Sequence, residues 1–156
     1  MRNLSFSLTI ILLASAISYA CTTDGIFPDK SPQCTPGSVY ENITEAEICV
    51  PGYSRTVRHT TSAMKRQVYE MYGIKPADRK LYVLDHLISL QLGGRDTIDN
   101  LFPQRKEPKP HSRDKDRIEN FLKRSVCKGE LTLKEAQEQI RTDWLDVYQD
   151  YLERND

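Results

Sequence analysis

The sequence contains no Cys-x-x-Cys pair, no internal repeat and no low-complexity tract. The first absence argues against a structural zinc ribbon, whose thiolates come from closely spaced cysteine pairs. No apolar run reaches the roughly 20 residues that a membrane-spanning helix needs. The net charge is zero, which by itself gives no attraction for a polyanion. The length of 156 residues is enough for one compact domain once the N-terminus is set aside.

The first 20 residues have the pattern of a secretory signal peptide. Arg2 precedes an apolar run over residues 8–17, and small residues lead to Ala20. We therefore expect a secreted or periplasmic protein whose mature chain begins at Cys21 and has no transmembrane segment. Lipid attachment at the Cys21 thiol is the alternative, although the residues before it match a lipidation signal poorly.

In an oxidising compartment the four cysteines are candidates for disulfides. Four thiols allow three pairings, and we expect Cys34 to pair with Cys49 because that bond closes a short loop rich in Pro, Gly and Ser. Closing a loop of that length stabilises a fold by about 3 kcal/mol, through restriction of the unfolded chain. The sequence leaves Cys21 and Cys127 either paired with each other or free.

Charge is distributed unevenly along the chain. Residues 50–128 hold 17 Lys and Arg against 9 Asp and Glu, residues 21–49 hold 1 against 5, and residues 129–156 hold 3 against 8. A polyanion responds to the local field rather than to the total charge, so the middle of the chain is the part suited to nucleic acid. An ordinary solvated surface of uneven composition is the alternative.

The spacing of apolar, Pro and Gly residues divides the mature chain in two. Residues 21–60 are interrupted by Pro and Gly, which predicts an irregular N-terminal extension pinned by a disulfide. Residues 61–156 contain the regular elements and are expected to form the domain. The first of these is a helix that begins at Ser62 and stops at Gly73.

Two short strands and two helices are expected after that helix. Residues 80–84 are rich in strand formers and lead directly into Asp85-His86, and residues 100–103 can form the return strand. We expect Ser112 to cap the next helix and Thr132 to begin the last one with a capping box. This order of elements predicts an α+β fold.

Asp85 and His86 are a pair of side chains suited to phosphodiester hydrolysis. A carboxylate holds a hard divalent cation, while the unperturbed pKa of an imidazole lies near neutrality and lets it accept a proton from water. The reaction needs both functions, because the cation stabilises charge on the phosphate and the base activates the nucleophile. A lone Asp-His pair is weak evidence, since a hydrogen-bonded core histidine would have the same sequence.

The residues around this pair resemble exported bacterial HNH endonucleases. His86, Asn100 and His111 stand at the three positions that name the motif, with a Gly-Gly turn between the first two. The matching segments are Cys34-Thr35-Pro36-Gly37, Ile48-Cys49-Val50-Pro51-Gly52-Tyr53, Asp85-His86-Leu87-Ile88, Leu92-Gly93-Gly94, Asn100-Leu101-Phe102-Pro103-Gln104, Lys115-Asp116-Arg117-Ile118-Glu119-Asn120 and Thr142-Asp143-Trp144. Together they cover about residues 34–150, nearly the whole mature chain.

The resemblance implies a ββα-metal fold, or His-Me finger, in which two short strands and a helix hold one divalent cation. Asp85 and His111 would be the metal ligands, His86 the general base, and Asn100 the residue that holds His86 in orientation. Mg is the expected ion, and the softer imidazole of His111 also suits Mn, Ni or Zn. Carboxylates that could substitute as ligands are Asp114, Asp116 and Glu119.

Seven cations surround the expected site in sequence and are candidates for binding phosphates: Arg95, Arg105, Lys106, Lys109, Arg113, Lys115 and Arg117. Such contacts neutralise the nucleic-acid backbone without reading bases. Since no separate DNA-reading module is evident, we expect low sequence specificity. His59 lies outside the motif and is expected at the surface.

The sequence thus predicts a secreted or periplasmic, metal-dependent endonuclease that cuts DNA, with RNA as a second candidate substrate. A monomer is expected, and an inhibitor partner is left open. The alternatives are a non-catalytic nucleic-acid-binding protein and an envelope-associated protein that keep the fold without the chemistry. Cleavage kinetics would separate the enzyme from the first alternative.

Overall fold

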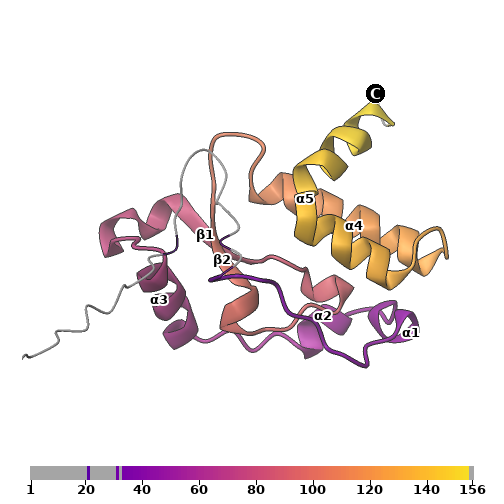
Figure 1. The fold of residues 1–156 in the computed structure, drawn as a ribbon, viewed down its shortest axis with the longest axis horizontal. Helices are drawn as coiled ribbons and strands as arrows, with labels where there is room; N and C mark the ends of the chain where they lie inside the picture. The colour runs from indigo at the N-terminus through magenta and orange to yellow at the C-terminus, as the bar shows by residue number, and fades with distance from the viewer. Residues whose placement is uncertain (1–20, 22–30, 32, 155–156) are drawn as a thin grey trace, which may run out of the picture.

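The computed structural model describes residues 21, 31 and 33–154 (Figure 1). The signal peptide expected over residues 1–20 lies outside the described residues. Within the described part of the chain, no helix is both long enough and apolar enough to cross a membrane.

A small antiparallel sheet of two strands lies at the centre of the fold. Strand β1 covers Tyr82–His86 and strand β2 covers Leu101–Arg105, with Asp85 opposite Phe102. The expected first strand thus starts two residues later than predicted and contains the Asp85-His86 pair itself. The expected return strand starts just after Asn100. Helices surround this sheet, so the α+β class is confirmed.

The helices are α1 (Glu45–Ile48), α2 (Tyr53–Thr56), α3 (Ser62–Met71), α4 (Ser112–Cys127) and α5 (Leu133–Glu153). Short 3₁₀ turns cover Pro76–Leu81, Leu90–Leu92 and Ile98–Asn100. The helix expected from Ser62 is confirmed. Figure 1 shows the strands between α3 on one side and the α4–α5 pair on the other.

The starts of the last two helices follow from their capping residues. Thr132 begins α5 with the expected capping box: its Oγ1 accepts from Glu135 N at 3.2 Å, and its own N–H donates to Glu135 Oε2 at 2.8 Å. The expectation for α4 is wrong by one residue, because His111 is the N-cap and Ser112 is already helical. Asp114 produces this shift, since its Oδ2 accepts from the backbone N of His111 at 3.0 Å.

Two hydrophobic clusters hold these elements together. The first packs α4 against α5 and also receives Ile48 from α1 and Ile88 and Leu92 from the loop after β1. The second packs α3 against the sheet through side chains such as Val68 and Leu101. The end of β1 therefore lies where the two clusters meet.

The disulfide pairing differs from the expectation. Cys34 bonds to Cys21 and Cys49 bonds to Cys127, with Cα–Cα distances of 6.0 and 5.7 Å, so the expected Cys34–Cys49 bond is wrong. Packing decides the pairing: Ile48 at the end of α1 lies in the core beside α4, which brings Cys49 to the C-terminal end of that helix. Because the sulfur of Cys21 forms a disulfide, it is not free to carry a lipid, and the lipid-anchored alternative is set aside.

Candidate functional site

Asp85 and His86 end strand β1 and point to different neighbours, because successive side chains of a strand alternate between its faces. Asp85 Oδ2 lies 3.2 Å from Nζ of Lys115 in α4. The imidazole Nε2 of His86 lies 2.8 Å from Oδ1 of Asp96, in the turn that leads to β2. The pair thus links two different parts of the chain to one strand end.

Lys115 is fully buried, and it corrects one prediction. Its Nζ donates to the backbone oxygen of His86 at 2.7 Å and to Oε1 of Glu119 at 2.6 Å, besides lying near Asp85. Burial lowers the pKa of Lys115, but the carboxylates of Asp85 and Glu119 raise it to about 12 overall. Lys115 is therefore a charged tie between α4 and β1, and its place among the phosphate-binding surface cations was wrong.

Glu119 completes this buried polar cluster. Its Oε1 accepts from Lys115, and its Oε2 accepts from the hydroxyl of Ser89 at 2.7 Å. Burial raises the pKa of Glu119, and the neighbouring ammonium lowers it. Since both carboxylate oxygens are engaged, Glu119 joins α4 to the loop after β1 and is poorly suited to be the substitute metal ligand that its chemistry suggested.

Asn100 is fully buried and closes the loop that follows His86. Its Oδ1 accepts from Ile88 N at 2.9 Å, and its Nδ2 donates to the carbonyl oxygens of Ile88 at 2.9 Å and Arg95 at 2.8 Å. Gly94 makes this closure possible, because a Cβ there would lie 1.9 Å from the Ile88 oxygen. Asn100 therefore fixes the loop. It was expected to orient the His86 ring, but the ring's hydrogen bond goes to another residue.

That residue is Asp96, which was not among the residues predicted for the site. Its side chain is 2 % exposed. Besides contacting His86, it accepts at Oδ1 from Thr60 Oγ1 at 2.6 Å and at Oδ2 from the backbone N of His59. In sequence Asp96 stands two residues after Gly94 and resembles an ordinary turn residue. The one available signal was a carboxylate ten residues after a motif histidine.

Arg58 also belongs to this side of the site. Burial lowers the pKa of His86, hydrogen bonding and charge from Asp96 and the charge of Asp85 raise it, and the Arg58 guanidinium lowers it, so that the net pKa is below the ordinary value. The same guanidinium lowers the pKa of Asp116, which burial and Asp85 raise.

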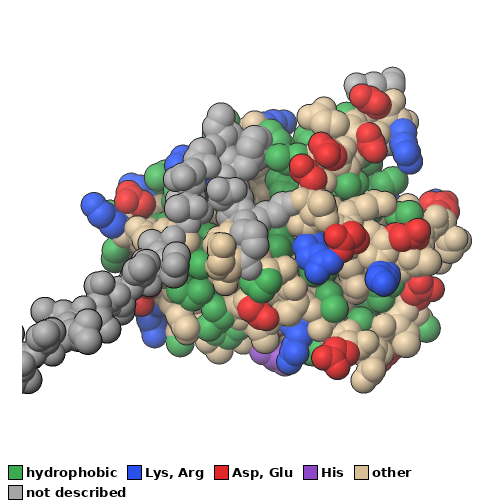
Figure 2. Space-filling model, in the orientation of Figure 1, with side chains coloured by type: hydrophobic (Ala, Val, Ile, Leu, Met, Phe, Trp, Pro, Cys, Tyr) green, Lys and Arg blue, Asp and Glu red, His purple; other side chains and the backbone are tan. Residues whose placement is uncertain are grey.

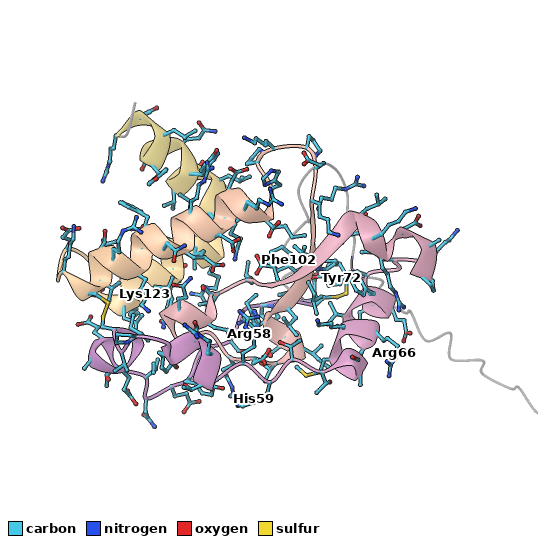
Figure 3. All side chains as sticks on the ribbon, turned by 180° about the vertical axis from the view of Figure 1, so that it is seen from behind. Arg58, His59, Arg66, Tyr72, Phe102 and Lys123 are labelled. Atoms are coloured by element: carbon cyan, nitrogen blue, oxygen red, sulfur yellow. A yellow bond between two sulfur atoms is a disulfide. The ribbon has the colours of Figure 1, made fainter. Side chains whose placement is uncertain are left out.

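Figure 3 shows Arg58 toward the centre of the molecule and His59 at its edge, on the segment between α2 and α3. Both side chains are exposed, which confirms the surface position expected for His59.

His111 occupies the N-terminal end of α4, one helical turn before Lys115 and on the same face. Its side chain is 10 % exposed, and its Nδ1 lies 3.2 Å from Asp114 Oδ2. The other oxygen of Asp114 accepts from the hydroxyl of Tyr148 at 3.2 Å. Because Lys115 reaches Asp85 from this helix face, His111 stands on the same side of α4 as the end of β1.

Both expected metal ligands have a buried polar atom at the site. Among the buried side-chain polar atoms that make no hydrogen bond in the described chain are Asp85 Oδ2 and His111 Nδ1, the two expected metal ligands. Each has one charged neighbour at 3.2 Å, Lys115 and Asp114 respectively. The described residues contain no cluster of three or more His, Cys, Asp or Glu arranged to hold a metal ion. Mg, however, commonly takes only one or two protein ligands and completes its sphere with water and phosphate oxygens.

The remaining cations expected to bind phosphates are mostly at the surface: Arg95, Lys106, Lys109, Arg113 and Arg117 are exposed, and Arg105 is half-buried. The guanidinium groups of Arg95 and Arg105 lie 5.7 and 5.5 Å from the ring centroids of Tyr40 and Tyr82. Acidic side chains instead gather around α5 in Figure 2, so a polyanion would avoid that helix. The phosphate-binding role of the exposed cations stays a prediction.

The site contains the buried imidazole of His86, which contacts the carboxylate of Asp96. The carboxylate of Asp85 and the guanidinium of Arg58 lie near the same ring. Such a set can take a proton from water beside a bound phosphate. No protein-family model, curated protein or solved structure matches the chain. The resemblance to HNH endonucleases therefore rests on the motif residues alone.

Proposed function

We propose that this protein is a metal-dependent endonuclease with a ββα-metal site, exported to the periplasm or the medium. One observation carries the proposal: Asp85 Oδ2 and His111 Nδ1, which the motif names as metal ligands, are both buried, and the single charged neighbour of each, Lys115 and Asp114, lies 3.2 Å away. Buried polar atoms that make no regular hydrogen bond are rare in folded proteins, and a bound ion is one of the explanations for them. The two disulfides support an oxidising compartment.

In this proposal His86 is the general base. Its pKa, lowered chiefly by burial, leaves the ring neutral at physiological pH, which is the form that can accept a proton from water. Asp85 and His111 would hold one divalent cation, Mg or a transition ion, which when bound stabilises charge on the phosphate and the leaving oxygen. Lys115 fixes the backbone of His86, and Asn100 fixes the loop beyond it.

DNA is the proposed substrate, with RNA as a second candidate, and sequence specificity is low. Arg58 and the exposed cations near the site meet backbone phosphates, which are the same for every base. Binding should therefore weaken steeply as salt is added.

Cleavage of supercoiled plasmid by the purified, disulfide-bonded protein tests the proposal. We expect nicking with Mg, Mn, Ni or Zn that stops with EDTA and in His86→Ala. His59→Ala is the matched control, because the His59 side chain is exposed and only its backbone contacts Asp96. If the folded protein binds DNA but nicks it with none of these ions, the non-catalytic binding protein becomes the better interpretation.

A further inference from the structure

The two ring nitrogens of His86 have different surroundings. Nε2 faces Asp96 Oδ1 at 2.8 Å, and both side chains are nearly sealed from solvent, at 4 and 2 % exposure. Nδ1 has no hydrogen-bond partner among the described residues, yet it is not among the sealed atoms that lack a partner. One nitrogen is therefore committed to a carboxylate, and the other is neither hydrogen-bonded nor fully sealed within the described part of the chain.

Asp96 is itself held in place from a distant part of the chain. Its two oxygens receive the Thr60 hydroxyl and the His59 backbone N–H, both from the segment that joins α2 to α3. Burial raises the pKa of Asp96, and the donated hydrogen bonds lower it to below the ordinary value overall. An ionised carboxylate has only acceptor sites, so its neighbour on the ring must be a donor.

We propose that Asp96 is a positioning residue that fixes His86 in the tautomer with its proton on Nε2 and leaves Nδ1 as the atom that takes the proton from water. The proposal deepens the proposed nuclease function and rests on it for the identity of the reaction. It goes beyond the motif, which includes neither Asp96 nor His59 and Thr60, which hold it.

The proton balance follows from this arrangement. Water gives one proton to Nδ1 while its oxygen bonds to phosphorus, and the bond from phosphorus to the leaving oxygen breaks. The leaving oxygen takes its proton from solvent. The ring becomes an imidazolium whose Nε2 proton stays on the ring and is stabilised by the charge of Asp96.

The substitution Asp96→Asn separates positioning from mere packing. Asparagine has the same shape but only one acceptor oxygen, and His59 N–H and His86 Nε2 would then compete for it. If the new amide oxygen accepts from the His59 N–H, the amide nitrogen at position 96 faces His86 Nε2. An N–H donor there favours the tautomer of His86 with its proton on Nδ1. The matched control is Asp99→Asn, because Asp99 lies in the same turn and bonds to Ser38 and Thr97 instead of to His86.

The experiment is ¹⁵N spectroscopy of the histidine rings in the metal-free protein, with the His86 signals assigned by their loss in His86→Gln. We expect a protonated Nε2 and an unprotonated Nδ1 in the wild type and in Asp99→Asn, and a mixed or reversed tautomer in Asp96→Asn. On plasmid, Asp96→Asn should lower kcat by on the order of 10²–10⁴-fold with KM nearly unchanged, as a wrong tautomer does in other enzymes.

The outcomes separate the two proposals. A wild-type His86 with its proton on Nδ1 would overturn the positioning role, and so would an Asp96→Asn protein that keeps both the tautomer and kcat. The wild-type tautomer can be measured even if Asp96→Asn does not fold, because only the assignment variant His86→Gln is needed. A protonated Nε2 in a protein that cuts no nucleic acid would support the hold of Asp96 on the ring while overturning the nuclease.

Discussion

The ammonium group of Lys115 donates a hydrogen bond to the backbone oxygen of His86 at 2.7 Å, from within a fully buried position. A helix and a strand are thus joined through a charged side chain at the residue that the proposed mechanism needs most. Displacing α4 would displace the backbone of His86 with it. The stability of the fold and the geometry of the site are coupled at this contact.

Replacement of Lys115 with Met should destabilise the protein strongly. It would leave the carboxylates of Asp85 and Glu119 close together without the ammonium between them, and loss of one partner from a buried ion pair costs about 3–5 kcal/mol. Lys109→Met, at an exposed position, should change stability by less than about 0.5 kcal/mol. Urea denaturation of the oxidised proteins measures both, and equal midpoints would contradict the proposed tie.

Gly94→Ala should prevent the loop after His86 from closing around Asn100. The added methyl group would meet the backbone of Ile88 and the amide of Asn100, which costs about 2–3 kcal/mol if the loop shifts and more if it does not. Gly129→Ala is the control, because open space surrounds it and only its positive φ is strained, at about 1 kcal/mol. The midpoint of thermal unfolding and the rate of plasmid nicking should both be lower in Gly94→Ala than in the wild type. Wild-type values for both would show that the loop can close in another way.

Arg58→Ala should weaken substrate binding without unfolding the protein. The side chain is exposed, and its charge acts on both His86 and Asp116, so it lies near the proposed site. We expect KM to rise several-fold and the salt dependence of binding to decrease by about one counterion. Arg55→Ala, an exposed arginine on α2, is the control. An equal loss of substrate binding in Arg58→Ala and Arg55→Ala would mean that Arg58 does not bind substrate at the site.

Acid should destabilise the wild type more than Asp96→Asn. The folded-state pKa of Asp96 is below its ordinary value of 3.8, so the carboxylate contributes stability that is present above this pH and is lost as pH falls through the folded pKa. Below about pH 4 the difference in unfolding free energy between the two proteins should therefore shrink. Denaturation from pH 7 to pH 2 tests this, and a constant difference would assign the effect of Asp96 to packing.

Metal binding should depend on the two proposed ligands, Asp85 and His111. His111→Ala and Asp85→Asn should each weaken the binding of Mn²⁺ to the protein, measured without nucleic acid, by roughly tenfold or more, since even indirect contacts to a metal ligand contribute that much. Electron paramagnetic resonance of free Mn²⁺ gives the affinity without any cleavage assay. His59→Ala is the control, and equal affinity in all proteins would place the cation elsewhere.

Local patterns predicted the local structure well. The Thr132 capping box, the start of α3 at Ser62 and the α+β class all depend on residues a few positions apart. The Gly-Gly turn was also predicted from the dipeptide itself, and the structure adds its reason, because the Asn100 amide lies close to the backbones of Gly94 and Ile88.

Contacts between distant segments were beyond the sequence. Lys115 was expected to bind phosphate, and its burial depends on partners from another helix turn and from β1. The Thr60–Asp96 contact joins residues 36 positions apart. The predicted cysteine pairing was wrong for the same reason. Proximity in sequence favoured Cys34–Cys49, whereas packing of α1 on α4 brings Cys49 to Cys127.

The Cys49–Cys127 bond closes the chain into a ring, because it joins two residues that are 78 positions apart in sequence. Every residue assigned to the site, from Arg58 to Glu119, lies inside that ring. Proteolysis of one peptide bond in the exposed residues 106–109 would open the ring but release neither fragment. The cut ends would stay tethered beside each other, so a protease would have to cleave twice to remove any part of the site.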